Sequence, residues 1–274
     1  MTAAAPNPGA QVVAAEGQVL AAEGQVLAAE GLAKSFAGFR AVDGVSFTVA
    51  AGEMVALIGP NGAGKTTTFN MINGQIRPDA GRVRLDGRDV TGAAPRVLWR
   101  LGVARTFQIT ATFGSMTVAE NVAVALLSRD NDLASPQAVA RRYRDEVERL
   151  LGEVGMAAAA ELLCGVLAYG DLKRVELALA LANAPRLLLM DEPTAGMAPK
   201  ERSALMGLVD RIARERGTAV LFTEHDMDVV FAHADRILVM NRGRLIASGS
   251  PEVVRRNAEV RDVYLGHGQA SGQH

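Results

Sequence analysis

The sequence predicts an α/β core that is interrupted by a helical segment, and three observations lead to this prediction. Short, continuous apolar runs at Met54–Ile58, residues 187–190 and Ala219–Thr223 have the pattern of strands buried on both faces. A glycine-rich loop and then a helical pattern follow the first run. Between residues 109 and 168 the pattern is mostly helical, which indicates an insertion into the core.

Size and composition set limits on the class of protein. The chain has 274 residues, of which 49% are hydrophobic, enough for one large α/β domain or a core with a small subdomain. Its formal net charge of −1 argues against a nucleic-acid binder. The single cysteine, Cys164, excludes a disulfide framework and is expected to be a small buried residue. No apolar run approaches the ~18 residues of a membrane helix, and no signal peptide is evident. We therefore expect a cytosolic protein, or one held at a membrane by partners.

The N-terminus carries a tandem repeat. Residues 14–20 read AAEGQVL, residues 21–27 repeat these letters, and a third copy starts at residue 28. A short heptad coiled coil is one interpretation. The glycine in each copy and the short array favour duplication of the lead-in to the first strand. We expect residues 1–25 to form a flexible tail, residues 26–266 one folded domain, and residues 267–274 a C-terminal tail.

Local signals define several further elements. A strand is expected at residues 44–49, and Asp86-Gly87 predicts a hairpin after the alternation around Val83. Thr117 with Glu120 forms a capping-box pattern, which predicts the start of a helix inside the insertion. A second hairpin is expected around residues 241–244.

A phosphate-binding loop is the strongest chemical signal. It fits the complete pattern G-x-x-x-x-G-K-[ST] and lies between a buried strand and a helix, as that pattern requires. Backbone N–H groups of the loop and the helix N-terminus would surround the phosphates. Lys65 would reach the β- and γ-phosphates, and Thr66 would hold Mg²⁺. The expected ATP-binding residues are Gly59, Pro60, Asn61, Gly62, Ala63, Gly64, Lys65, Thr66 and Thr67.

Two carboxylates follow the apolar run at residues 187–190. Asp191 is predicted to bind Mg²⁺, directly or through water, and Glu192 to act as the general base on the attacking water. His225 follows the run at Ala219–Thr223, and a contact with the γ-phosphate is its functional interpretation. Gln108, at the entry to the helical insertion, has an amide that could contact Mg²⁺ or its water.

These motifs occur in an order that resembles the ABC-type ATPases. Across most of the chain, the phosphate loop, Gln108, the segment LAYGD at residues 167–171, Asp191-Glu192 and His225 match that family. The resemblance implies a P-loop NTPase (RecA-like) core with a small antiparallel β-subdomain and an inserted α-helical subdomain. It implies that two such chains enclose two ATP molecules head to tail. Each chain's signature segment, here Ala168, Tyr169, Gly170 and Asp171, then contacts the nucleotide of the other chain. Phe36 is the expected adenine-stacking residue, with Phe39 as the second choice.

The finer resemblance is to ATPases of branched-chain (hydrophobic) amino-acid importers. It rests on GPNGAGKTT at residues 59–67, GVARTFQ at 102–108, DEPTAGM at 191–197, EHDM at 224–227 and YLG at 264–266. It implies two membrane permease subunits, a second ATPase, a periplasmic substrate-binding protein and a place at the cytoplasmic face of the inner membrane. Urea and amide importers of the same superfamily are similar. A P-loop kinase, a repair or translation ABC protein and an exporter ATPase fit fewer of the motifs.

Two departures from the family pattern favour a heterodimer over a homodimer. Ala168 stands where the wider family has a serine, and Asp171 stands where it has a glutamine. Residues 195–199 also lack the usual aspartate near Ala198. A missing hydroxyl bond to a charged acceptor would cost about 1–3 kcal/mol. In a homodimer both sites would carry this loss, whereas in a heterodimer only the partner's nucleotide would meet Ala168.

Overall fold

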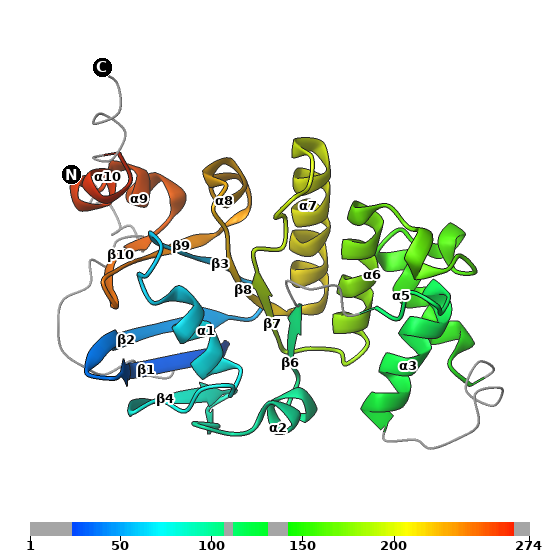
Figure 1. The fold of residues 1–274 in the computed structure, drawn as a ribbon, viewed down its shortest axis with the longest axis horizontal. Coiled ribbons are helices and arrows are strands. Elements are labelled where there is room, and N and C mark those ends of the chain that lie inside the picture. The colour runs from blue at the N-terminus through cyan, green and yellow to red at the C-terminus, as the bar shows by residue number, and fades with distance from the viewer. Residues whose placement is uncertain (1–23, 107–111, 131–141, 266–274) are drawn as a thin grey trace, which may run out of the picture.

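The structure, a computed structural model, describes residues 24–106, 112–130 and 142–265. Gln108, most of the N-terminal repeat and the predicted C-terminal tail lie outside these ranges. The described strands form one six-stranded and one four-stranded sheet, and a group of helices stands to one side of them (Figure 1). Within these residues, no helix combines the length and the apolar character needed to span a bilayer.

The six-stranded sheet forms the centre of the core, in the order β10-β9-β3-β8-β7-β6. Its strands are β3 (Met54–Ile58), β6 (Val103–Thr106), β7 (Leu187–Asp191), β8 (Ala219–Thr223), β9 (Arg236–Asn241) and β10 (Arg244–Gly249). All neighbouring pairs are parallel except β9 and β10. Every residue of β3, β7 and β8 is buried, which explains their continuous apolar runs. The carboxyl ends of these three neighbouring strands therefore lie at one edge of the sheet.

The four-stranded antiparallel sheet, in the order β2-β1-β4-β5, packs with helix α1 against one face of this core. It consists of β1 (Gln25–Phe36), β2 (Phe39–Ala50), β4 (Ala80–Leu85) and β5 (Arg88–Asp89), and α1 is Lys65–Ile72. Phe69 and Ile72 of α1 are buried in the same apolar cluster as Leu57 of β3 and Val45 of β2. The strand expected at residues 44–49 is thus part of a longer strand, because β2 pairs with β1 as far as the Phe36–Phe39 turn.

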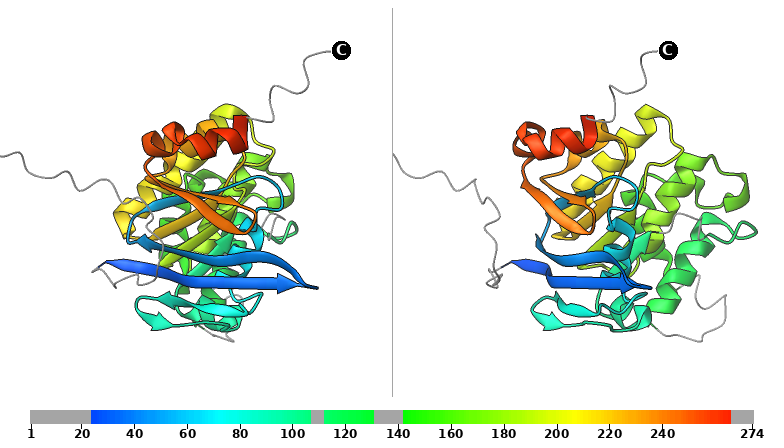
Figure 2. Two further views of the ribbon diagram at one scale, coloured as in Figure 1. Left: turned by 90° about the vertical axis from the view of Figure 1, so that its left-hand side faces the viewer. Right: turned by 60° about the vertical axis from the view of Figure 1, so that its left-hand side comes forward.

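Helices cover the other face of the central sheet. They are α6 (Tyr169–Leu181), α7 (Pro199–Arg216) and α8 (Met227–His233), with α9 (Pro251–Arg256) and α10 (Ala258–Leu265) near β10 (Figures 1 and 2). Leu188 and Met190 of β7 pack toward this helical cluster, whereas Leu187 and Leu189 pack toward α1 and the second sheet. One strand therefore contributes to both cores, as its full burial requires.

The helical segment contains α3 (Val118–Asp130), α5 (Arg144–Glu153) and the short 3₁₀ turns Ala157–Ala159 and Cys164–Val166. The separate helix α2 is Pro95–Arg100. The predicted capping box forms: Thr117 N donates to Glu120 Oε2 at 2.8 Å, and Glu120 N donates to Thr117 Oγ1 at 3.1 Å. Cys164 is buried, as expected. The fold confirms the predicted α/β core, antiparallel β-subdomain and inserted helical subdomain.

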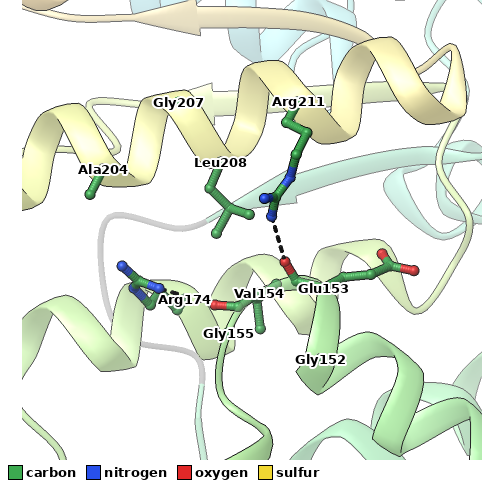
Figure 3. Close-up of a pocket in the computed structure, with 9 residues that line it drawn as sticks. All are labelled: Gly152, Glu153, Val154, Gly155, Arg174, Ala204, Gly207, Leu208 and Arg211. Carbon is green, nitrogen blue, oxygen red and sulfur yellow. Dashed lines mark hydrogen bonds between the residues drawn. The ribbon is translucent and has the colours of Figure 1, made fainter.

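A pocket of about 490 Å³ lies where α5 meets α6 and α7 (Figure 3). Arg211 on α7 donates to the carbonyl of Glu153 at 3.2 Å, and Arg174 on α6 donates to the carbonyl of Val154 at 3.3 Å. Arg216 also pairs with the Glu153 carboxylate. These arginines satisfy carbonyl groups at the end of α5, so they fasten the helical subdomain to the core.

Candidate nucleotide site

The phosphate loop is tightly held between β3 and α1. Gly64 has φ 101°, a left-handed conformation, and a Cβ at this position would lie 2.5 Å from the Ala41 carbonyl oxygen. A Cβ on Gly59 would lie 2.4 Å from the Met240 carbonyl oxygen. Both carbonyls belong to the backbone and cannot move aside as a side chain would. The glycines therefore let the loop sit directly against the neighbouring strands.

The N-terminus of α1 faces this loop without any side-chain cap. No side chain accepts from its first N–H groups, and its first turn contains no acidic residue. Uncapped N–H groups at a helix N-terminus favour an anion such as a phosphate. Lys65, the first residue of α1, is buried and donates through Nζ to the Gly59 carbonyl at 2.6 Å and to the Pro60 carbonyl at 3.2 Å. Its ammonium therefore lies across the loop that would bind phosphates.

Burial lowers the pKa of Lys65, and the nearby carboxylates of Glu192 and Asp191 oppose that shift. The two effects have a simple physical origin. Removing an ammonium from water disfavours its charged form, while negative neighbours favour it. A bound polyphosphate would add further negative charge and so favour the charged lysine.

Asp191 ends β7 and has partners on both carboxylate oxygens. Thr223, its register partner on β8, donates through Oγ1 to Oδ1 at 2.7 Å. Arg105 on β6 pairs with Oδ2 at 3.2 Å. The side chain of Asp191 is 9% exposed, so these contacts stabilise its charge in place of water.

Glu192 and His225 meet beyond the ends of β7 and β8. His225 Nε2 lies 2.8 Å from Glu192 Oε1, and both side chains retain access to solvent. Glu192 has φ 50°, which is unusual for a residue with a long side chain. Its N–H is held by the carbonyl and the hydroxyl oxygen of Thr223 at 3.1 Å each. The strained backbone directs the carboxylate away from the strand and toward His225.

The LAYGD segment forms the start of α6, next to the loop that follows β7. Ala168 is the N-cap of α6 but makes no side-chain capping bond. Ala168 and Tyr169 are exposed, and Tyr169 packs near Gly196 in the loop after β7.

Phe36 and Phe39 face each other across the turn between β1 and β2. They are 45% and 67% exposed, so either ring is accessible to a ligand. Asp79 anchors the end of β1 by accepting from Lys34 Nζ at 2.6 Å and from the N–H of Ser35 at 2.8 Å. The carboxylate thus fixes the backbone beside Phe36 and leaves Phe39 without an equivalent support.

Comparison with known proteins decides the family. A family model described as "ABC transporter" matches residues 42–195, and one described as "Branched-chain amino acid ATP-binding cassette transporter" matches residues 244–270. The high-affinity branched-chain amino acid transport ATP-binding protein BraF of Pseudomonas aeruginosa is 40% identical over 243 residues. That alignment covers 86% of this chain and 95% of BraF. The chain belongs to the ABC transporter ATPases, of the branched-chain amino-acid type.

Other relatives agree with this assignment to the family. The lipopolysaccharide export system ATP-binding protein LptB of Haemophilus influenzae is 36% identical, over 86% of this chain and 95% of LptB. A solved structure, the ADP conformation of the ATP-binding cassette MJ1267, has a TM-score of 0.77 and 32% identity. It covers 88% of this chain and 99% of that one.

The residues of this ABC ATPase fit a bound Mg²⁺ of the kind that nucleotides bring with them. Mg²⁺ prefers oxygen ligands, keeps several waters and is usually held by few protein groups plus phosphates. Thr66 offers a hydroxyl beside the phosphate loop, and Asp191 offers a carboxylate at the end of β7. Among the described residues no group of three or more His, Cys, Asp or Glu side chains forms a metal cage. The donor set therefore suits a metal that arrives with a nucleotide. Gln108, the third predicted ligand, lies outside the described residues.

Three residues with structural roles at this ATPase site were not assigned by the sequence. Glu224, 5% exposed, accepts from Thr194 N at 2.9 Å and Thr194 Oγ1 at 2.6 Å, and its other oxygen accepts from His225 N at 3.2 Å. Arg105 and Thr223 hold Asp191, as described above. Glu224 belongs to the EHDM motif and Arg105 to the GVARTFQ motif. Membership of these motifs was the only sequence signal that pointed to the two residues. Apart from His225, their partners are distant in sequence and cannot be read from it.

Proposed function

We propose that this chain hydrolyses ATP with Mg²⁺ to drive the import of branched-chain or other hydrophobic amino acids. One observation supports the hydrolytic part of the proposal: Lys65 follows β3, Asp191 ends β7, and the Glu192–His225 pair lies beyond β7 and β8, which are three neighbouring parallel strands. A cation for phosphates, a carboxylate for a metal and a carboxylate beside an imidazole thus share one sheet edge. Similarity to BraF and membership of its family support the transport part of the proposal.

In the proposed reaction each residue has a separate task. Lys65 and the N–H groups of α1 hold the phosphates and compensate their charge. Thr66 and Asp191 would hold Mg²⁺, which when bound neutralises charge on the β- and γ-phosphates. Glu192 accepts a proton from the attacking water, and His225 positions the γ-phosphate after exchanging its contact with Glu192. The strained backbone of Glu192 keeps its carboxylate within reach of the attacking water and of His225.

We further propose that the complete site needs a second ATPase. Ala168 and Tyr169 are exposed, which leaves them accessible to a partner's nucleotide. Ala168 offers no hydroxyl, either to the N-terminus of α6 or to a γ-phosphate across the interface. These features support a heterodimer in which the partner's signature segment completes this chain's site; a homodimer is the competing arrangement.

The proposed contact with the membrane permeases uses the helical subdomain. Phe113 and Val166 are 55% and 72% exposed, large values for apolar side chains. They lie on adjoining loops, because the N–H of Gly165 donates to the carbonyl of Gly114 at 3.0 Å. An apolar surface here would be covered by two permease subunits, which would hold the chain at the cytoplasmic face of the cell membrane. A periplasmic binding protein would deliver the substrate to the same complex.

Substituting Glu192 by glutamine tests the hydrolytic proposal. The amide keeps the size of the side chain but cannot accept the proton, so ATP binding should persist while turnover falls by at least about 100-fold. Binding of a fluorescent ATP analogue and phosphate release would be measured on the same preparations. Normal phosphate release by Glu192→Gln protein would exclude Glu192 as the base.

An uptake experiment tests the substrate class. Cells lacking this chain, complemented by wild type or by the Glu192→Gln variant, would be supplied with labelled leucine, valine or urea. We expect wild type alone to restore leucine and valine uptake. Restoration of urea uptake without amino-acid uptake would replace the proposed substrate by that of a urea importer.

A further inference from the structure

Arg105 makes an unusual set of contacts around the predicted metal carboxylate. It lies on β6, whose register places it beside Leu189 of β7, and its side chain is only 16% exposed. Its Nη2 pairs with Asp191 Oδ2 at 3.2 Å. Its Nη1 donates to Asn70 Oδ1 on α1 at 3.0 Å and to Gln75 Oε1 at 2.9 Å. One guanidinium therefore joins β6, the helix of the phosphate loop and the end of β7.

The third nitrogen of this guanidinium, Nε, has no partner among the described residues. Nε of Arg105 is buried and makes no hydrogen bond in the structure. A buried donor without a partner is costly, so the contacts with Asp191, Asn70 and Gln75 hold the guanidinium in this position despite that cost.

The lone pairs of Asp191 explain why another cation would change this arrangement. Thr223 donates to Oδ1 and Arg105 donates to Oδ2, so a metal ion or its bound water at either oxygen would share that oxygen with one of these donors. A hydroxyl can stay beside a carboxylate that binds a metal, whereas a guanidinium repels the metal's charge. We propose that Arg105 is a positioning residue for the metal site, which neutralises Asp191 before Mg²⁺ binds and gives up that carboxylate when it binds.

This exchange connects the metal site to the helical subdomain. Arg105 lies three residues before Gln108, on the strand that leads into the insertion. Asn70 and Gln75 can keep holding Nη1 when Asp191 is released, so the guanidinium has a defined resting place. Arrival of the metal thereby alters the anchoring of β6 at the point where the chain leaves the core.

The experiment compares nucleotide affinity with and without metal, and it rests on the proposed role of Mg²⁺. Binding of a fluorescent ATP analogue would be titrated with Mg²⁺ in a Glu192→Gln background, which excludes hydrolysis. In the neutral variants Arg105→Met and Arg105→Gln, the Mg²⁺ concentration that gives half of the maximal effect on nucleotide binding should fall by about tenfold. The reason is that no side-chain cation then competes with Mg²⁺ for Asp191. Arg105→Lys keeps the charge and should stay within about threefold of the parent. Two neutral variants are used in case one does not fold.

Two controls separate this role from a general structural one. Gln75→Ala removes an uncharged contact of the same guanidinium and should leave the Mg²⁺ dependence unchanged. Adding Asp191→Asn should abolish the difference between Arg105→Gln and its parent, because the pair no longer exists. Thermal unfolding should show a larger stabilisation by Mg²⁺ with ATP, relative to ATP with EDTA, in the neutral variants.

The outcomes distinguish a failure of the proposed role of Arg105 from a failure of the proposed metal site. An unchanged or increased Mg²⁺ requirement in both neutral variants would overturn the role of Arg105. If nucleotide binding by the parent protein does not respond to Mg²⁺ at all, the proposed metal site itself fails. The first failure is seen only in the variants, and the second is already seen in the parent protein.

Discussion

Replacing Glu224 by alanine would test how the loops after β7 and β8 are held together. Glu224 is buried and charged, and it receives three hydrogen bonds: two from Thr194 and one from the N–H of His225. Thr194 lies two residues after Glu192, so a single carboxylate holds the segments that carry the proposed base and the histidine. The substitution removes the acceptor and leaves two backbone N–H groups and one hydroxyl without a partner.

The expected magnitude follows from these bonds. Hydrogen bonds to a charged group contribute about 1.5–3 kcal/mol each, and they are not additive within one cluster. We expect Glu224→Ala to lower the free energy of unfolding by about 3–5 kcal/mol. Thr194→Val removes only the hydroxyl and should cost about 1–2 kcal/mol. Together the two changes should cost less than their sum, because they break one shared bond.

Urea unfolding, ATP turnover and nucleotide affinity would be measured on the same set of variants. Turnover by the Glu224→Ala variant should fall by about tenfold or more, because a rise of about 1.4 kcal/mol in the activation free energy already lowers the rate tenfold. Nucleotide affinity should change little, because the phosphate loop follows a different strand. The reasoning is refuted if turnover stays normal, or if affinity falls as much as turnover does.

Three further predictions concern the nucleotide and the partners. Gly64→Ala places a Cβ 2.5 Å from the Ala41 carbonyl oxygen, on a residue with φ 101°. Nucleotide binding measured by fluorescence should therefore fall at least about tenfold, and normal binding would show that the phosphate loop does not need glycine at this position. Phe36→Ala should weaken ATP binding by about tenfold through lost stacking, with Phe39→Ala as the matched control; the reverse order would make Phe39 the adenine contact. Val166→Asp should abolish co-purification with the permease subunits while ATP binding by the purified chain is kept, and intact co-purification would exclude that docking surface.

The local pattern of the sequence predicted the strands and the catalytic motifs because each rests on neighbouring residues. The apolar runs of β3, β7 and β8 are continuous since both faces of a central parallel sheet are buried. The phosphate loop and the capping box at Thr117 likewise use backbone groups only a few residues away. The extent of β2 was underestimated, because Val42 is the one buried residue in its first half, too little for an apolar signal, although this half pairs with β1.

What the sequence by itself determined is the family and the order of the motifs, which place the residues proposed for phosphate binding and hydrolysis, a lysine with glycines, an Asp-Glu pair and a histidine, near the ends of predicted strands. The tertiary structure decided how these groups are held. It placed Arg105 and Thr223 within hydrogen-bond distance of the two carboxylate oxygens of Asp191. It also brought His225 into contact with Glu192, and Thr194 into a hydrogen bond with Glu224. These pairs are separated by about thirty residues or more and form because β6, β7 and β8 are neighbours in one sheet. Sheet order depends on packing across the whole chain, so no local pattern can specify it.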